Sequence, residues 1–299
     1  MAGSLLIIIS AVAFGFMALF ERWARRDGVS TEMLLLLRFA IAGMALTGWM
    51  LATRTRWPRG RDAVIALLMG AGLYAGMSLC YFHGLRHIPA GLVALLLYLY
   101  PVIVTILARL ILHERITPMR LLAIALAVFG LALTVGPLAL DALRNTPVKG
   151  GNGRSAVLGI ALGIGSALCY SIYILLGGPV TKRAGAIPVA TMVMLAAAAV
   201  FACIALPRGD ALPSSMTGWS GALGLALFST LLAITAFLAG LQRVGAVQAS
   251  TLSTLEAVTT VIVGAAFLGD AFKPIQIVGG GLILIAAVMI ARTQRVSSA

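Results

Sequence analysis

GLRHIPAGLVALLLYLYPVIVTILARLILHERITP, residues 84–118, and GLQRVGAVQASTLSTLEAVTTVIVGAAFLGDAFKP, residues 240–274, share one layout. Each begins with Gly-Leu, continues through an apolar segment of helical length, and ends in a turn with an acidic residue before a proline. They align at a constant offset of 156 residues (240 − 84). The matches include Gly84/Gly240, Leu85/Leu241, Ala90/Ala246, Leu112/Leu268, Glu114/Asp270 and Pro118/Pro274, and further out Ser10/Ser166, Phe14/Tyr170 and Arg26/Lys182. The chain is therefore one unit written twice.

The composition identifies the environment of this repeated unit. Of the 299 residues, 61% are hydrophobic and 10% are charged, and the mean hydropathy is +1.05. Soluble domains carry about 25% charged residues. Apolar runs of about 17–25 residues span a bilayer as helices, because only helices and closed barrels satisfy every backbone polar group in lipid. The alternation of barrel strands is absent from the sequence, so we predict an all-α integral membrane protein.

Ten transmembrane helices are expected, five in each repeat. They fall at 4–20, 31–52, 62–83, 89–112, 118–136, 155–177, 187–206, 217–240, 246–268 and 274–291. Because five is odd, the second repeat must enter the membrane from the opposite side, which gives a five-plus-five inverted repeat about a pseudo-two-fold axis in the membrane plane. We assign 1–136 to the first repeat, 137–154 to a flexible linking loop, and 155–299 to the second repeat.

The net charge of +13 lies mainly in short turns between apolar runs. We interpret these charges as anchors of helix ends at the lipid surface, and not as a nucleic-acid site, because the basic run at 54–62 belongs to no basic groove. Slightly more Lys and Arg lie on the side of the amino terminus, so both termini are expected in the cytoplasm and the 137–154 link in the periplasm. The first segment lacks the basic start and cleavage site of a signal peptide.

Pro101 lies inside the fourth span and removes a backbone hydrogen bond, which predicts a kink there. Its repeat partner is Ala257, so we expect the two halves not to be mechanically equal. A hinge at Pro101 is one hypothesis, and a purely structural kink is the other.

The ninth span is unusually polar for a helix in lipid, so part of it should line a cavity or a close helix contact. Its polar residues are Gln248, Ser250, Thr251, Ser253, Thr254, Glu256, Thr259 and Thr260. Glu256 is the single acidic residue near the centre of a span, and Arg38 is the deepest basic one. Charges at that depth cost about 2.5–3.5 kcal/mol on insertion scales and tend to be paired or used. Glu256 therefore binds a substrate amine, exchanges a proton, or is tolerated beside cavity water or a hydroxyl.

Aromatic and hydroxyl side chains also gather within the spans and not at their ends. With Glu256, the predicted substrate-binding residues are Tyr74, Ser78, Tyr81, Tyr98, Tyr100, Tyr170 and Phe14. A tyrosine away from the interfaces suits a cavity in which the ring packs on an apolar ligand and the hydroxyl binds a polar group. Each of these residues is alternatively part of the helical core. Cys80, Cys169 and Cys203 lie inside apolar helices and are expected to pack, so we predict neither disulfides nor a metal site.

The repeated architecture and the turn HERITP, echoed by GDAFKP, resemble the EamA-type exporters of the drug/metabolite transporter superfamily. The resemblance implies a basket of ten helices around a central cavity, and export by alternating access. It further implies a secondary transporter that moves small metabolites, in particular aromatic or other neutral amino acids, out across the bacterial inner membrane. The second turn lacks the His and Arg of the first, which argues against one symmetric role for both turns.

Two other classes of function stay open. A channel or non-transporting scaffold is the first, although the inverted repeat favours alternating access. A membrane-embedded enzyme is the second, although the sequence shows no catalytic constellation. No cofactor is expected, because no nucleotide-binding segment is present. The expected partners are a small-molecule substrate and the lipid bilayer, without nucleic acid, and the sequence does not decide between a monomer and a homodimer.

Overall fold

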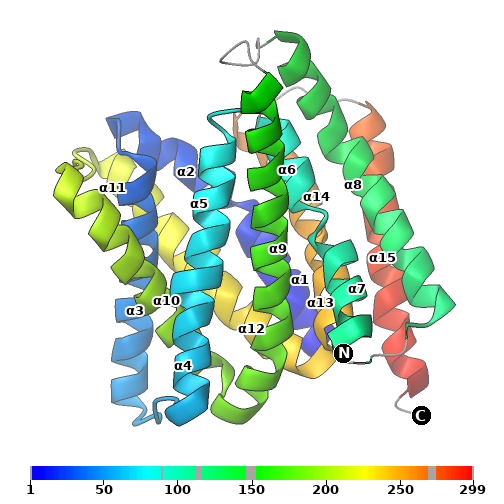
Figure 1. The fold of residues 1–299 in the computed structure, drawn as a ribbon, viewed down its shortest axis with the longest axis horizontal. Helices are drawn as coiled ribbons and strands as arrows, with labels where there is room; N and C mark the ends of the chain where they lie inside the picture. The colour runs from blue at the N-terminus through cyan, green and yellow to red at the C-terminus, as the bar shows by residue number, and fades with distance from the viewer. Residues whose placement is uncertain are drawn as a thin grey trace.

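The computed structural model describes residues 2–88, 90–111, 113, 116–145, 153–268 and 274–297, and all regular structure in these ranges is helical (Figure 1). Within them, nine helical stretches are long and apolar enough to cross a membrane, and Pro274–Ile290 is a shorter tenth. The ten predicted spans and the all-α class are thereby confirmed. The acidic turns of the repeat, with Glu114 and Asp270, lie outside the described residues.

Several spans are divided into more than one helical element. The first repeat contains α1 (Ala2–Gly15), α2 (Met17–Ala24), η1 (Arg25–Asp27), α3 (Thr31–Ala52), α4 (Gly60–Leu68), η2 (Met69–Tyr74), α5 (Ala75–Gly84), α6 (Ala90–Leu97), α7 (Tyr100–Ile111) and α8 (Pro118–Asn145). The second contains α9 (Gly153–Ala184), α10 (Ala186–Ala205), η3 (Leu206–Arg208), α11 (Met216–Leu223), η4 (Gly224–Leu232), α12 (Ala233–Val244), α13 (Ala246–Ser253), α14 (Leu255–Val263), η5 (Gly264–Leu268) and α15 (Pro274–Ser297).

The helices pack as an inverted repeat. Equivalent helices pair at opposite edges of the bundle, α3 with α10 and α8 with α15 (Figure 1). In the first pair Phe39 stacks on Phe201 with ring centroids 5.8 Å apart, while the backbone of Gly43 approaches Leu195. Residue numbers thus rise along one helix as they fall along the other, so the two repeats run in opposite directions. Two further equivalent contacts also join the repeats: α1 packs on α12, and its counterpart α9 packs on α5.

Glycine brings α8 and α15 into backbone contact. A Cβ added at Gly279 would lie 2.5 Å from the carbonyl oxygen of Gly130, a distance that no side chain tolerates. Next to this contact, the Gln276 Nε2 donates to the Thr134 carbonyl at 3.0 Å. Small residues and interhelical hydrogen bonds of this kind hold helices together in lipid, where no hydrophobic effect drives their association.

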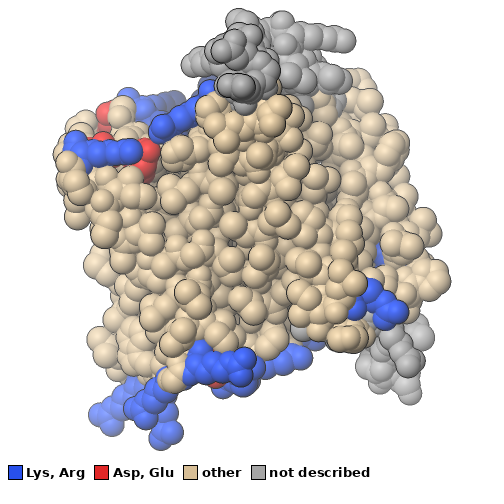
Figure 2. Space-filling model, in the orientation of Figure 1, with Lys and Arg blue, Asp and Glu red and all other residues tan. Residues whose placement is uncertain are grey.

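The flank of the bundle carries an apolar surface. On the face shown in Figure 2, Lys and Arg lie toward the two ends and leave a broad uncharged band between them. Large apolar side chains such as Leu121, Phe129 and Ile277 are exposed along α8 and α15. A soluble monomer rarely exposes so many large apolar side chains together, whereas lipid tails accommodate them. The chain begins and ends at the same end of the bundle, as an even number of spans requires (Figure 1).

The segment expected as a linking loop, 137–154, is helical at both of its ends. Helix α8 continues to Asn145 and α9 begins at Gly153, so the loop as predicted is too long. The reason is local composition, because residues 138–143 read LALDAL and consist mostly of strong helix formers. Residues 146–152 lie outside the described part of the chain.

Interruptions fall at equivalent depths in the fourth and ninth spans. Helix α6 ends at Leu97 and α7 begins at Tyr100, so the break predicted at Pro101 is present. The ninth span breaks at Thr254, between α13 and α14, without a proline. The expected difference between the halves is therefore not seen in the course of the backbone. At this break the Thr254 hydroxyl donates to the Thr251 carbonyl at 2.7 Å, and bonds of this kind to a helix's own carbonyls favour bending.

Candidate functional site

Arg38 lies at the centre of the bundle and joins the two repeats. Its side chain is 6% exposed. The Nε donates to the Thr230 hydroxyl at 2.6 Å, and the Nη2 donates to the Tyr74 hydroxyl at 3.2 Å. Tyr74 and Thr230 are themselves repeat partners, separated by the offset of 156 residues (230 − 74). Arg38 therefore lies close to the pseudo-two-fold axis, where one side chain reaches equivalent residues of both repeats, and its own repeat partner is the buried Met194.

The two partners of Arg38 lie in matching irregular segments. Tyr74 ends η2 and Thr230 lies in η4, and both segments are π-helical turns inside otherwise α-helical spans. Such π-turns are rare in proteins and occur often at functional sites. Helix α3 presents Arg38 from the other side, and it begins at the cap Ser30, whose hydroxyl accepts from the Met33 N–H at 3.1 Å.

A chain of aromatic rings leads away from Arg38. Tyr74 meets Tyr173 edge to face at 5.3 Å between centroids, Tyr173 stacks on Tyr170 at 6.1 Å, and Tyr170 meets Tyr100 edge to face at 4.8 Å. Tyr98 continues the chain at 6.4 Å from Tyr100. Edge-to-face and offset arrangements are the favoured geometries for aromatic pairs. The structure thus brings four of the predicted tyrosines into one continuous cluster and adds Tyr173 to it.

Glu256 lies near this aromatic cluster, which draws tyrosines from both repeats. It lies in the first turn of α14, directly after the interruption at Thr254, where the partial positive charge of a helix amino terminus favours a carboxylate. Its side chain is partly exposed and lies within electrostatic range of Arg38 and of several tyrosines. Those tyrosines are Tyr74, Tyr81, Tyr98, Tyr100 and Tyr170. Among the described residues, the Glu256 carboxylate forms no ion pair and no hydrogen bond.

The other polar groups of the ninth span bond mostly within their own helix. The hydroxyls of Ser250 and Thr251 donate to the Val247 carbonyl at 2.9 Å each, and the Ser253 hydroxyl donates to the Ala249 carbonyl at 2.9 Å. Gln248 makes a close helix contact, because its Nε2 donates to the Ile290 carbonyl on α15 at 3.2 Å. These bonds explain how so polar a helix is accommodated, and they leave Glu256 as the polar side chain of this span without a hydrogen bond among the described residues.

The remaining predicted site residues occupy different surroundings. Tyr81 is partly exposed, meets Phe82 edge to face at 5.5 Å, and lies within electrostatic range of both Glu21 and Glu256. Ser78 is buried and donates to the Tyr74 carbonyl of its own helix at 3.0 Å. Phe14 is buried in the main hydrophobic core, and Pro101 lies in the first turn of α7.

Two features of the site escape a reading of single residues. Thr230 attracts no attention in the sequence, yet applying the repeat offset to Tyr74 leads directly to it. Ser10 and Ser166 are likewise repeat partners, and both are fully buried hydroxyls for which the described residues offer no hydrogen-bond partner. Pairing across the repeat is therefore the signal that finds these positions.

A narrow space connects Arg38 with one end of the bundle. It measures about 20 Å³, which is room for about one water molecule. The lining residues are Met17, Glu21, Arg25, Thr31, Leu34, Leu35, Arg38, Phe82 and Leu225. A larger groove of about 450 Å³ lies toward the other end, between α4 and α9, and does not include the aromatic cluster.

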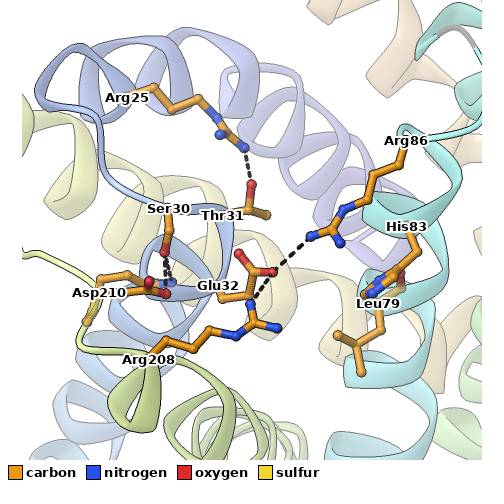
Figure 3. Close-up of polar contacts among 10 residues, drawn as sticks. Arg25, Ser30, Thr31, Glu32, Leu79, His83, Arg86, Arg208 and Asp210 are labelled. Atoms are coloured by element: carbon orange, nitrogen blue, oxygen red, sulfur yellow. Dashed lines mark hydrogen bonds and ion pairs between the residues drawn. The ribbon is translucent and has the colours of Figure 1, made fainter. Parts of the chain in front are cut away.

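Ion pairs join the helices at the mouth of the narrow space (Figure 3). The Glu32 carboxylate on α3 accepts from Arg208 at 2.9 Å and from Arg86, at the end of α5, at 3.4 Å. Arg25 donates to the Thr31 hydroxyl at 2.8 Å and pairs with Glu21 at 2.8 Å. Ser30 donates to Asp210 at 2.6 Å. This network ties both repeats together at one end of the bundle.

Comparison with known proteins places this arrangement in a family. The sequence profile of the EamA-like transporter family matches residues 1–136 and 157–292. The threonine/homoserine exporter RhtA of Escherichia coli (strain K12) is 26% identical over 84% of this chain and 78% of its own. A probable terminal-alkyne amino-acid exporter of Streptantibioticus cattleyicolor is 25% identical over 89% of this chain and 86% of its own. The uncharacterized transporter YcbK of Bacillus subtilis (strain 168) is 26% identical over 94% and 89%.

The fold also matches a solved structure. A crystal structure that is 19% identical in sequence superimposes with a TM-score of 0.79 over 99% of both chains, which shows the same fold. The family profile covers nearly the whole chain in two halves that correspond to the two five-helix units. The protein is a multi-pass membrane protein and belongs to the EamA-like transporter family.

Proposed function

We propose that the protein exports neutral amino acids, aromatic or small, across the bacterial inner membrane by alternating access. The observation that carries the proposal is Glu256, a carboxylate at mid-span that is partly exposed, lies near a cluster of tyrosines and has no ion-pair partner among the described residues. A charge at mid-membrane without a partner is unfavourable unless a ligand or water satisfies it. The ammonium group of an amino acid supplies the missing positive charge.

The tyrosine cluster suits the rest of such a substrate. Tyr81, Tyr98 and Tyr170 are partly exposed and lie within electrostatic range of Glu256. An aromatic ring provides apolar contact for a side chain, and its hydroxyl provides a polar contact. Further support comes from the relatives named above, of which two are described as exporters of amino acids.

The proposed cycle exposes Glu256 to the two sides of the membrane in turn. Inverted repeats move substrates in this way, with the binding site near the midplane at the interface between repeats. Arg38, Tyr74 and Thr230 occupy that interface here. In this proposal both termini face the cytoplasm, so the network of Glu32, Arg86 and Arg208 lies at the periplasmic end.

Transport in proteoliposomes tests the proposal. Purified protein should carry radiolabelled threonine and phenylalanine with saturable, mutually competitive flux and with no single-channel conductance. Unsaturable flux or unitary currents would indicate a channel. Absence of flux for every neutral amino acid, from well-folded protein, would reject the proposed function.

Reporter fusions test the orientation. A reporter that is active only in the periplasm should be silent at either terminus and active when inserted between residues 146 and 152. Activity at a terminus would reverse the assignment of the two ends.

A further inference from the structure

We propose that Arg38 binds the carboxylate of the transported amino acid. This inference rests on the proposed function and identifies the second charged group of the proposed binding site. Glu256 then holds the ammonium group, and the substrate lies between two protein charges of opposite sign. Four observations support this role: the unused donors of Arg38, its place close to the pseudo-two-fold axis, the space in front of it, and its separation from Glu256.

The first observation is that some N–H donors of the Arg38 guanidinium lack a strong acceptor. A guanidinium group carries five N–H donors. In the described part of the chain, the acceptors of Arg38 are the Thr230 hydroxyl, the Tyr74 hydroxyl and the Met17 sulfur, and none of them is charged. Within the described residues, the hydrogen-bond acceptor of the Nη1, which has two N–H groups, is that thioether sulfur at 3.5 Å. A thioether is a weak acceptor, so the Nη1 edge of a buried cation is available for a stronger one.

The second observation is position. The bonds from Arg38 to Tyr74 and Thr230 engage equivalent residues of the two repeats, both within π-helical segments. A ligand at Arg38 is therefore held by both halves at once. This is the location at which transporters with inverted repeats bind their substrates.

The third observation is the direction in which the Nη1 edge points. Met17, the residue it contacts, lines the narrow space together with Glu21, Arg25 and Phe82. At about 20 Å³ this space admits a water molecule but no amino acid. A substrate carboxylate thus reaches Arg38 only when the helices around the space move apart, as alternating access requires.

The fourth observation is that Arg38 and Glu256 attract each other without meeting. Each lies in the electrostatic field of the other, yet they form no ion pair within the described residues. A direct pair would neutralise both groups and leave nothing for a ligand. Separated charges instead match the two ends of a zwitterion, and Arg binds carboxylates with two parallel hydrogen bonds. The site then selects amino acids over amines and over simple carboxylic acids.

The first test uses the unmodified protein. Competition against labelled threonine in proteoliposomes compares threonine with threoninamide, which keeps the ammonium group but has no carboxylate. Threoninamide is expected to compete about 10- to 100-fold more weakly, the range for a hydrogen bond between charged groups. Equal competition by the two compounds would overturn the role of Arg38 and leave the proposed function standing.

Arg38→Gln provides the second test, because glutamine keeps donors near Thr230 and Tyr74 but carries no charge. The apparent affinity for threonine should fall about 10- to 100-fold, while that for threoninamide stays within about twofold, so the discrimination disappears. A purely structural role of Arg38 would weaken both compounds equally. Arg38→Lys keeps the charge but loses the two-pronged geometry, and it should recover part of the discrimination.

Arg25→Gln is the matched control. Arg25 lines the same narrow space, but it already pairs with Glu21, so its loss should leave the threonine-to-threoninamide ratio unchanged. If Arg38→Gln folds and retains the wild-type ratio, Arg38 does not bind the carboxylate. If the wild-type protein moves no neutral amino acid at all, this inference and the proposed function are both overturned.

Discussion

At equivalent depths of the two repeats, the chain breaks a helix and places a different side chain beside the break. In the first repeat the break precedes Pro101 and carries Tyr100, and in the second it follows Thr254 and carries Glu256. Tyr100 and Glu256 are repeat partners (256 − 100 = 156). The backbone is therefore nearly symmetric while the charge is not. The inverted repeat supplies two matching positions, and only one of them holds an acid.

The largest effect should come from removing that acid. Glu256→Gln should lower amino-acid binding by about 100-fold or more, because the ammonium group loses its charged partner in a low-dielectric site. Tyr100→Phe, the matching change in the first repeat, should lower it only a few-fold. Isothermal titration with threonine on detergent-purified variants measures both. Intact binding by Glu256→Gln, combined with loss of gradient-driven accumulation, would assign Glu256 to proton exchange instead.

The next largest effect should come from the aromatic wall. Tyr81→Ala should reduce the apparent affinity for phenylalanine about tenfold and that for threonine about twofold, since ring contact is worth about 1 kcal/mol. Tyr81→Phe is the control that retains the ring. Competition assays with both amino acids give the comparison. An equal loss for both substrates would point to a structural role for Tyr81.

A smaller effect is expected from exchanging the residues at the two breaks. Ala257→Pro removes the N–H that donates to the Thr254 carbonyl at 3.1 Å, which should cost about 1 kcal/mol of stability. Pro101→Ala should cost less, because the second repeat breaks its helix without proline. Thermal unfolding followed by fluorescence ranks the two variants. A large loss of transport in Pro101→Ala at unchanged stability would favour a hinge at Pro101.

The smallest effect should come from the junctions at the two ends. Arg183 binds Asp62 at 2.6 Å and joins α9 to α4, and the equivalent junction at the other end uses Asp27, which accepts from the Ser214 and Ser215 N–H groups at 2.9 and 2.8 Å. Asp62→Ala removes an exposed ion pair, whereas Asp27→Ala removes the carboxylate that holds Ser215, the N-cap residue of α11, in place. Melting temperatures should therefore fall less for Asp62→Ala, and its effect should vanish in 1 M salt, where the screening length is about 3 Å.

Much of this fold follows from the sequence because each repeat independently supports the same assignment of helices. Apolar length predicts the spans, and the offset predicts which helices are equivalent and that they run in opposite directions. The ends of α8 and α9 were less predictable, since Gly and Pro near residues 137–154 conceal the helix-forming run LALDAL. Helix propensity outweighed the turn signals there.

The sequence predicted which residues form the candidate site but not how they are arranged in space. Tyr74, Tyr100, Tyr170 and Glu256 stand out in the sequence because polar groups are costly in lipid. Their order in space depends on how α3, η2, α9 and α14 cross, which no local pattern encodes. The break at Thr254 is similar, since it depends on which hydroxyls turn back to their own helix.

Arg38 also has an electrical consequence. It lies close to the axis about which the two halves exchange roles, so alternating access leaves its charge at nearly the same depth in the membrane. Moving one elementary charge through a membrane potential of 100 mV involves about 2.3 kcal/mol, and a charge on the axis avoids that work. A zwitterion carries no net charge either. The Arg38 charge and the bound zwitterion should therefore add no voltage dependence to export, and Arg38→Gln should leave the ratio of rates in polarised and depolarised vesicles unchanged.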